Sequence, residues 1–228
     1  MHVEPPGHAP STLKEFGFHY LMIVLGILTA LGLEAGVEAL HHRRQALKTT
    51  EQVETELRAN LAEVRSTLGH NRETLKLVMG IYGELKQLAQ QGAVPPETLK
   101  QMLGERLRIS VFTPGLRRDA WDTAVAGQAL VHLRHDTLRR LSEAYTAQRE
   151  AQQAITTSFN AGGSLTRLTD VTVDAEFGRA NPLDVLKALQ GYRLTLSAVV
   201  GVETELESQL AQALGAAAPA AAASVTAH

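Results

Sequence analysis

The sequence predicts an all-α protein in which one N-terminal transmembrane helix continues into a bundle of three long helices plus two short helices. Two observations predict this fold class. Residues Phe16 to Leu33 carry no charged side chain. Later stretches repeat apolar residues at alternating intervals of three and four, which is the period of a packed helix. The composition agrees, because only 4% of the residues are aromatic and Ala, Leu, Gln, Glu and Arg are abundant.

The apolar segment from Phe16 to Leu33 is long enough to be a membrane anchor. As an α-helix it would span about 27 Å, close to the thickness of the hydrocarbon core of a bilayer. We therefore divide the 228 residues into four parts. These are a disordered, proline-rich tail (1–12), the transmembrane helix with its juxtamembrane extension (13–45), a helical bundle domain (46–215) and a disordered, Ala-rich tail (216–228).

A cleaved signal peptide is the alternative interpretation of the apolar segment. Ala30-Leu31-Gly32 and Val37-Glu38-Ala39 resemble small-residue cleavage sites. Against this interpretation, the apolar stretch exceeds the roughly 7–15 residues usual in a signal peptide, and Lys14 is the one Lys or Arg before it. A buried core helix is disfavoured because no other stretch is comparably apolar. We expect an uncleaved anchor.

Small residues in the anchor suggest a helix-dimer face. Gly32 and Gly36 form a GxxxG pattern, and Gly26 with Ala30 extends the small-residue stripe. Such spacing lets two membrane helices approach closely. The alternative is that glycine is simply common in membrane helices, and both interpretations stay open.

Three seams of apolar residues predict the long helices of the bundle. Each seam steps by four and three, as in a helix packed lengthwise on its neighbours. The seams comprise Leu57, Leu61, Val64, Leu68, Asn71, Leu75, Val78, Tyr82 and Leu85; then Leu138, Leu141, Tyr145, Gln148, Gln152, Ile155 and Phe159; and finally Leu189, Tyr192, Leu196, Val199, Glu203, Leu206, Leu210 and Ala213.

Shorter elements connect the long helices. The stretch 96–107 starts with Pro in its first turn and predicts a short helix. Thr113 and Pro114 predict the start of a second short helix over about 114–126. Residues 161–181 lack sustained periodicity, so we predict a loop or an irregular segment there.

Polar residues that interrupt the three seams predict a shared polar layer. We assume that the first long helix runs away from the membrane, the second returns and the third runs out again. At about 1.5 Å per residue, Asn71, Gln148, Gln152 and Glu203 would then lie near the middle of the bundle. We expect Glu203 to accept hydrogen bonds from the amides and to fix the register of the helices. The alternative is that local rotation turns each side chain toward water.

No set of residues commits the chain to a reaction. Asp119 and Asp122 flank Trp121, and two carboxylates on one helix face could serve acid–base chemistry or hold a cation. We favour a structural role, with Trp121 as a core anchor. His132 and the neighbouring pair His135-Asp136 have a spacing seen in metal sites, but no second group of ligands completes them. We predict no catalytic residue, no metal and no cofactor.

Charge and composition exclude several other classes. The net charge of −2 and the lack of a basic stripe argue against a nucleic-acid partner. A chain without cysteine has no disulfide, no thiol nucleophile and no zinc–thiolate site. Phosphate-loop, dinucleotide-binding and hydrolase motifs are also missing from the sequence.

Three stretches together resemble a large group of uncharacterised bacterial single-pass membrane proteins. They are the membrane segment IVLGILTALGLE, the charged long helix after it, and DAWDTAVAGQAL followed by LRRLSEAYTAQ. The resemblance implies an anchor in the bacterial inner membrane and a helical domain on the periplasmic side. Arg43, Arg44 and Lys48 after the span point to the cytoplasm instead. We expect a periplasmic domain, because a large domain can translocate regardless of such charges.

These observations predict a membrane-anchored helical interaction or scaffold protein without catalytic activity. Its expected partners are the lipid bilayer and, through the membrane helix, a second copy of the chain. The alternative is a sensor-like bundle that binds a small ligand between its helices and signals through the anchor. A buried, polar-lined pocket in the bundle would favour the sensor.

Overall fold

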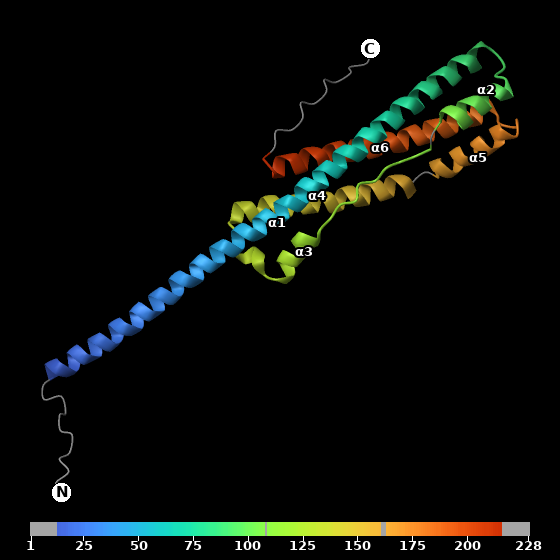
Figure 1. Cartoon of the computed structure of the whole chain (residues 1–228). Helices are drawn as coiled ribbons and strands as arrows, with labels where there is room; N and C mark the ends of the chain where they lie inside the picture. Colours follow the sequence, from blue (N-terminus) through green and yellow to red (C-terminus); the bar gives the residue numbers. More distant parts are fainter. Residues whose placement is uncertain (1–12, 108, 161–162, 216–228) are drawn as a thin grey trace, which may run out of the picture.

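The computed structural model describes residues 13–107, 109–160 and 163–215, and the described residues are mostly helical (Figure 1). They contain no strand, so the predicted all-α class is confirmed. The tails predicted over 1–12 and 216–228 lie outside the described residues. In chain order the elements are α1 (Leu13–Gln91), α2 (Pro96–Lys100), the π-helix η1 (Gln101–Arg106), α3 (Asp119–Ala126), the 3-10 helix η2 (Ala129–His132), α4 (His135–Asn160), α5 (Ser164–Glu176) and α6 (Pro182–Ala213).

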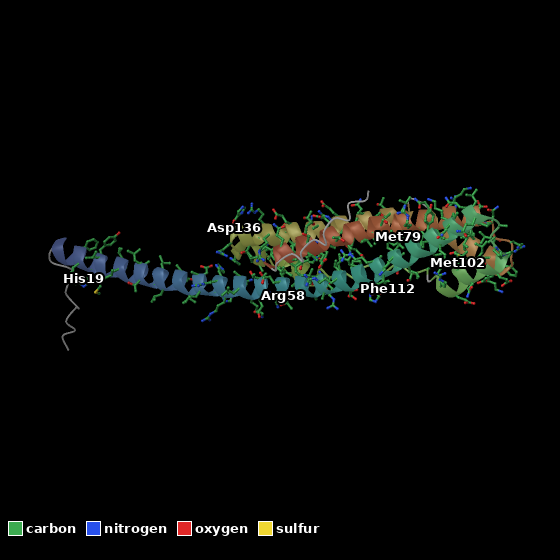
Figure 2. The ribbon with its side chains drawn as sticks, turned by 90° about the horizontal axis from the view of Figure 1, so that it is seen from above. His19, Arg58, Met79, Met102, Phe112 and Asp136 are labelled. Atoms are coloured by element: carbon green, nitrogen blue, oxygen red, sulfur yellow. The ribbon has the colours of Figure 1, made fainter. Side chains whose placement is uncertain are left out.

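Helix α1 combines the apolar segment and the first long seam in one unbroken helix of 79 residues. Its N-terminal part projects beyond the bundle, as the position of His19 in Figure 2 shows. The most apolar 18-residue window of this part is 0% buried, and the helix is long and apolar enough to cross a membrane. Burial of one face begins near Thr49. The predicted membrane helix therefore runs into the bundle without a linker.

Helix α6 is the centre of the bundle. It packs against α1 on one side and against α4 and α5, which follow one another in line, on the other (Figure 1). Helices α1 and α4 make few contacts with each other. Every residue of the predicted α6 seam is buried, from Leu189 to Ala213. The apolar seams therefore mark the packed faces, as expected from their period.

Both the second and the third long helix run opposite to our assumption, since the C-terminal end of α6 at Ala213 contacts Arg140, which also binds Glu54 near the anchor. Residues 109–118 form no helix, and this segment carries the chain back along α1 toward the anchor. Helix α4 consequently runs away from the anchor: Arg140 near its start bonds Glu54 of α1, and Ser164 after its end bonds Thr195 of α6. The predicted helix over 114–126 begins only at Asp119. A proline disfavours helical backbone at the residue before it, which suits Thr113 in an extended path.

Residues 164–176 form helix α5, so the loop predicted over 161–181 is wrong for most of its length. Leu168, Val171 and Ala175 lie on one buried face. The segment is rich in Thr and Val, which have low intrinsic helix propensity. Packing against α6 overrides that local preference. The described part of the chain thus contains six α-helices, where three long and two short ones were predicted.

The buried apolar residues form two clusters rather than one. The first includes Leu57 and Val64 of α1 and Leu206 of α6. The second includes Val78 of α1 and Leu196 of α6, farther from the anchor. Trp121, the predicted core anchor, belongs to the first cluster at 9% exposure. Its ring stacks on Tyr145, with centroids 4.8 Å apart.

Candidate functional site

A buried polar pair separates the two apolar clusters. The side-chain amide of Asn71 on α1 donates to both carboxylate oxygens of Glu203 on α6, at 3.1 and 3.0 Å. Both side chains are 0% exposed. The first cluster ends at Val64 and Leu206 and the second begins at Val78 and Leu196, so this pair lies between them.

Burial dominates the electrostatics of Glu203. Removing the carboxylate from water raises its pKa, because the charged form loses its hydration. The hydrogen bonds from Asn71 and the charge of Arg72 act in the opposite direction but do not cancel the effect of burial. Among the described ionisable groups, buried Tyr192 is also shifted, with its pKa raised chiefly by burial.

Asn71 also holds the returning segment. Its amide nitrogen donates to the carbonyl of Phe112 at 2.8 Å, and its amide oxygen accepts from the N–H of Phe112 at 3.0 Å. Asn60 binds Arg117 in the same way, at 2.8 and 2.9 Å. Each asparagine therefore satisfies both backbone groups of one extended residue, much as a neighbouring β-strand would.

The spacing of these two contacts explains their register. Asn60 and Asn71 are eleven residues apart, which is about three helical turns and about 16.5 Å along one face of α1. Arg117 and Phe112 are five residues apart, and an extended chain covers about 16.5 Å in five residues. The two repeats match, so both asparagines can bind the segment without distorting it.

Two further side chains fasten the same connection. The hydroxyl of Tyr192 on α6 donates to the carbonyl of Ser110 and accepts from its N–H, at 2.9 and 3.2 Å. Glu56 of α1 accepts from the N–H of Ala120 at 2.9 Å and from the hydroxyl of Tyr145. The route from Ser110 to Ala120 is thus bound at four points by α1 and α6.

Only part of the predicted polar layer is present. Asn71 and Glu203 meet, but Gln148 accepts from Asn60 at 3.3 Å instead. That contact lies about 16.5 Å nearer the anchor than Asn71. Gln152 is exposed and belongs to neither contact. The reason is the direction of α4, which was assumed to run toward the anchor and in fact runs away from it.

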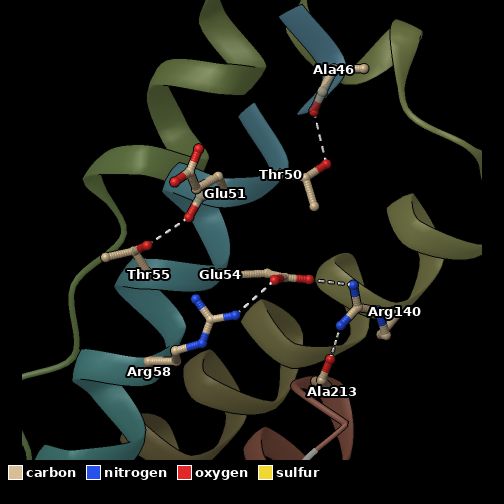
Figure 3. Close-up of polar contacts among 8 residues, drawn as sticks. All are labelled: Ala46, Thr50, Glu51, Glu54, Thr55, Arg58, Arg140 and Ala213. Carbon is tan, nitrogen blue, oxygen red and sulfur yellow. Dashed lines mark hydrogen bonds and ion pairs between the residues drawn. The ribbon is translucent and has the colours of Figure 1, made fainter. Parts of the chain in front are cut away.

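A second set of polar contacts ties α1 to α4 and α6 near the anchor (Figure 3). Glu54 pairs with Arg58 of α1 at 3.0 Å and with Arg140 of α4 at 2.6 Å. Arg140 also donates to the carbonyl of Ala213. The last carbonyls of a helix have no partner within it, so Arg140 caps the C-terminal end of α6.

The other candidate residues form no reactive arrangement. Asp119 and Asp122 are exposed, and Asp122 pairs with Arg118 at 3.3 Å. His132 stacks on His42 of α1, with ring centroids 4.0 Å apart. Within residues 13–107, 109–160 and 163–215, no group of three or more His, Asp or Glu side chains could hold a metal ion.

The small residues of the anchor do not lie on one face of α1. At about 100° per residue, the pair Gly32 and Gly36 lies about 120° around the helix from Gly26 and Ala30. A Cβ atom added at Gly26, Gly32 or Gly36 would meet no atom within 4 Å. Packing within the described chain therefore does not require glycine at these three positions.

Sequence reasoning missed Asn60, Glu56 and the contacts of Tyr192. Asn60 and Asn71 are eleven residues apart and lie on the helix face that carries the buried leucines. This spacing could have indicated that both asparagines are buried and bind a common partner. The partners of both asparagines are backbone groups, which no side-chain pattern reveals.

Comparison of the chain with models of known protein families, with curated proteins and with solved structures finds no match.

Replacing Asn71 with Leu should destabilise the bundle strongly. The change leaves the buried Glu203 carboxylate and both part-buried backbone groups of Phe112 without this partner. An unpaired buried group costs about 1–3 kcal/mol, and a part-buried group costs less. We expect a loss of about 3 kcal/mol or more in the free energy of unfolding, measured by urea titration of the full chain in detergent. Gln52→Leu is the matched control, since exposed Gln52 lies on the same helix. Equal stability of both variants would contradict the role of Asn71.

Glu203→Gln should remove a pH dependence of stability. Burial raises the pKa of Glu203 above its ordinary value of 4.5. Wild-type stability should therefore be complete below about pH 4.5 and fall as pH rises through the folded-state pKa, because the unfolded chain gives up the proton more readily. Thermal melts should show Glu203→Gln more stable than wild type at pH 7.5, with the difference vanishing near pH 4. Exposed Glu205→Gln should follow the wild-type profile, and the same profile in Glu203→Gln would refute the argument.

Proposed function

We propose that the chain is a single-pass membrane protein whose helical domain serves as a non-catalytic interaction or scaffold module. The observation that carries this proposal is the single helix α1, which is exposed along its apolar part and buried along its C-terminal part. A folded chain in water would not leave so many large apolar side chains uncovered. A lipid bilayer supplies the missing apolar surroundings.

The polar groups of the bundle support a structural rather than a catalytic role. Asn60, Asn71 and Glu203 bind backbone or each other, so these groups are already occupied. The sensor alternative calls for a buried, polar-lined pocket. Two of the larger hollows, of about 620 and 730 Å³, are open to the surface, and neither is lined by Asn71 or Glu203. The interaction role is therefore our first choice.

We place the anchor in the bacterial inner membrane and the bundle in the periplasm. The chain should stay with the membrane pellet after carbonate extraction. Because it has no cysteine, Ser142→Cys introduces a single thiol at an exposed site of α4. A membrane-impermeant maleimide should label this thiol in intact spheroplasts, whereas Ser11→Cys in the N-terminal flank should react only after lysis. Release by carbonate would overturn the anchor, and the reverse labelling would place the bundle in the cytoplasm.

We also propose that two copies associate through the face that carries Gly32 and Gly36. Two differently tagged full chains should co-purify from solubilised membranes, together with any further protein partner. Gly32→Leu with Gly36→Leu should reduce this self-capture by about tenfold, since bulky side chains prevent close approach of the helices. Gly26→Leu on the other face is the control and should leave capture unchanged. Equal capture by all variants would exclude this dimer face.

A further inference from the structure

A hollow of about 650 Å³ lies at the end of the bundle nearest the anchor, between α1 and the turn from η2 into α4. Four of its lining residues carry basic or imidazole side chains: His42 and Arg43 from α1, and His132 and Arg134 from the turn. No Asp or Glu lines it, and its remaining residues are apolar or carry hydroxyls. Two segments far apart in the sequence thus bring positive charge to one place.

The two guanidinium groups of this hollow are not neutralised. Arg43 and Arg134 are exposed, and within the described part of the chain neither side chain forms a hydrogen bond or an ion pair. The nearest carboxylate contact is that of Glu38 with His42, at 3.9 Å. Asp136, two residues after Arg134, lines a different hollow with Arg139 and Arg140. The site therefore has free donors and a positive field.

The stacked imidazoles hold the two sides of the hollow together. The rings of His42 and His132 are nearly parallel, at 17°. A neutral imidazole carries one N–H donor and one acceptor, so each ring can offer a hydrogen bond to an anion. The stack brings the α1 segment of Arg43 and the turn of Arg134 to the same hollow, which suits the binding of one phosphate group between them.

The position along α1 identifies the source of the anion. Val37 and Leu40 are exposed apolar residues beyond the core of the apolar segment. Arg43 is ten residues after Leu33, the end of the apolar segment, and thus about 15 Å farther along the helix axis. The headgroup region adds several ångströms to each side of the hydrocarbon core, and a flexible Arg side chain can reach back toward it. Apolar Leu47 in the hollow, 65% exposed, and Val131, which precedes His132 in the chain and is 73% exposed, suit a lipid better than a free ion.

We infer that this hollow binds the phosphate of an anionic lipid headgroup in the leaflet next to the bundle. Arg43 and Arg134 supply the charge, and His42 and His132 supply further hydrogen bonds. The inference rests on the proposed membrane anchor. Bound lipid would join the turn after η2 to the membrane surface at a second point, beside the anchor itself. This second contact would limit rotation of the whole chain about the axis of α1.

Native mass spectrometry of the full chain in detergent tests this site. Phosphatidylglycerol and phosphatidylcholine with identical acyl chains are offered in equal amounts. The wild type should retain phosphatidylglycerol preferentially, and Arg43→Gln with Arg134→Gln should lower this preference by about tenfold, because each basic group near a lipid surface contributes to anion binding. Arg149→Gln with Arg167→Gln makes the same charge change at exposed positions elsewhere on the bundle and should keep the preference. Arg43→Lys with Arg134→Lys should restore most of it.

Each other outcome counts against the site. Equal preference in the wild type and in the Arg43→Gln, Arg134→Gln variant would show that these are ordinary solvated charges. Displacement of the lipid by millimolar glycerol 3-phosphate would show a site for a soluble phosphate instead. Circular-dichroism melts verify that the variants fold. Because binding is measured in detergent, a negative result leaves the carbonate-extraction test of the anchor untouched, and the two proposals can fail separately.

Discussion

The main constraint on this fold is the backbone of the returning segment, because an extended chain cannot satisfy its own N–H and C=O groups. Asn60 and Asn71 bind two of its residues from α1, and Tyr192 binds a third from α6. These contacts allow the chain to return to the anchor without a helix. The return in turn requires α4 and α5 to run outward and α6 to run back, so that α6 can pack between them and α1.

Burying the carboxylate of Glu203 reduces the stability of the folded chain, but the position of this group helps to set the register of α6 on α1. Desolvation raises its pKa, so burial opposes the charged form. The carboxylate lies between two apolar clusters, where it accepts hydrogen bonds from the side-chain amide of Asn71. A slip of α6 by one turn along α1 would move the carboxylate by about 5.4 Å toward an apolar cluster. Glu203 therefore selects one register, as a polar residue does in a coiled-coil seam.

Sequence reasoning found the faces of the helices more readily than their directions. Periodicity placed the α6 seam and most of the α1 seam on buried faces, because burial depends on the local period of a helix. The direction of α4 depends on how residues 109–118 run, and hydrogen bonds from distant side chains to backbone determine that path. Gln148 and Gln152 were misplaced for this reason. Helix α5 was missed because its Thr and Val residues have low helix propensity and its buried face is short. Packing on α6 stabilises this helix.

The unbroken course of α1 also determines how the bundle is oriented relative to the apolar part of that helix. A flexible linker would let the domain turn freely, whereas a continuous helix sets the direction of the bundle along the helix axis. Near the anchor, Glu54 ties α1 to Arg140, which also holds the end of α6, and the stack of His42 on His132 adds the turn before α4. The end of the bundle is therefore tied to the part of α1 that follows the apolar segment. A change in the tilt or rotation of the apolar segment would move all three long helices together, which suits the proposed scaffold that presents one surface at a set distance from a bilayer.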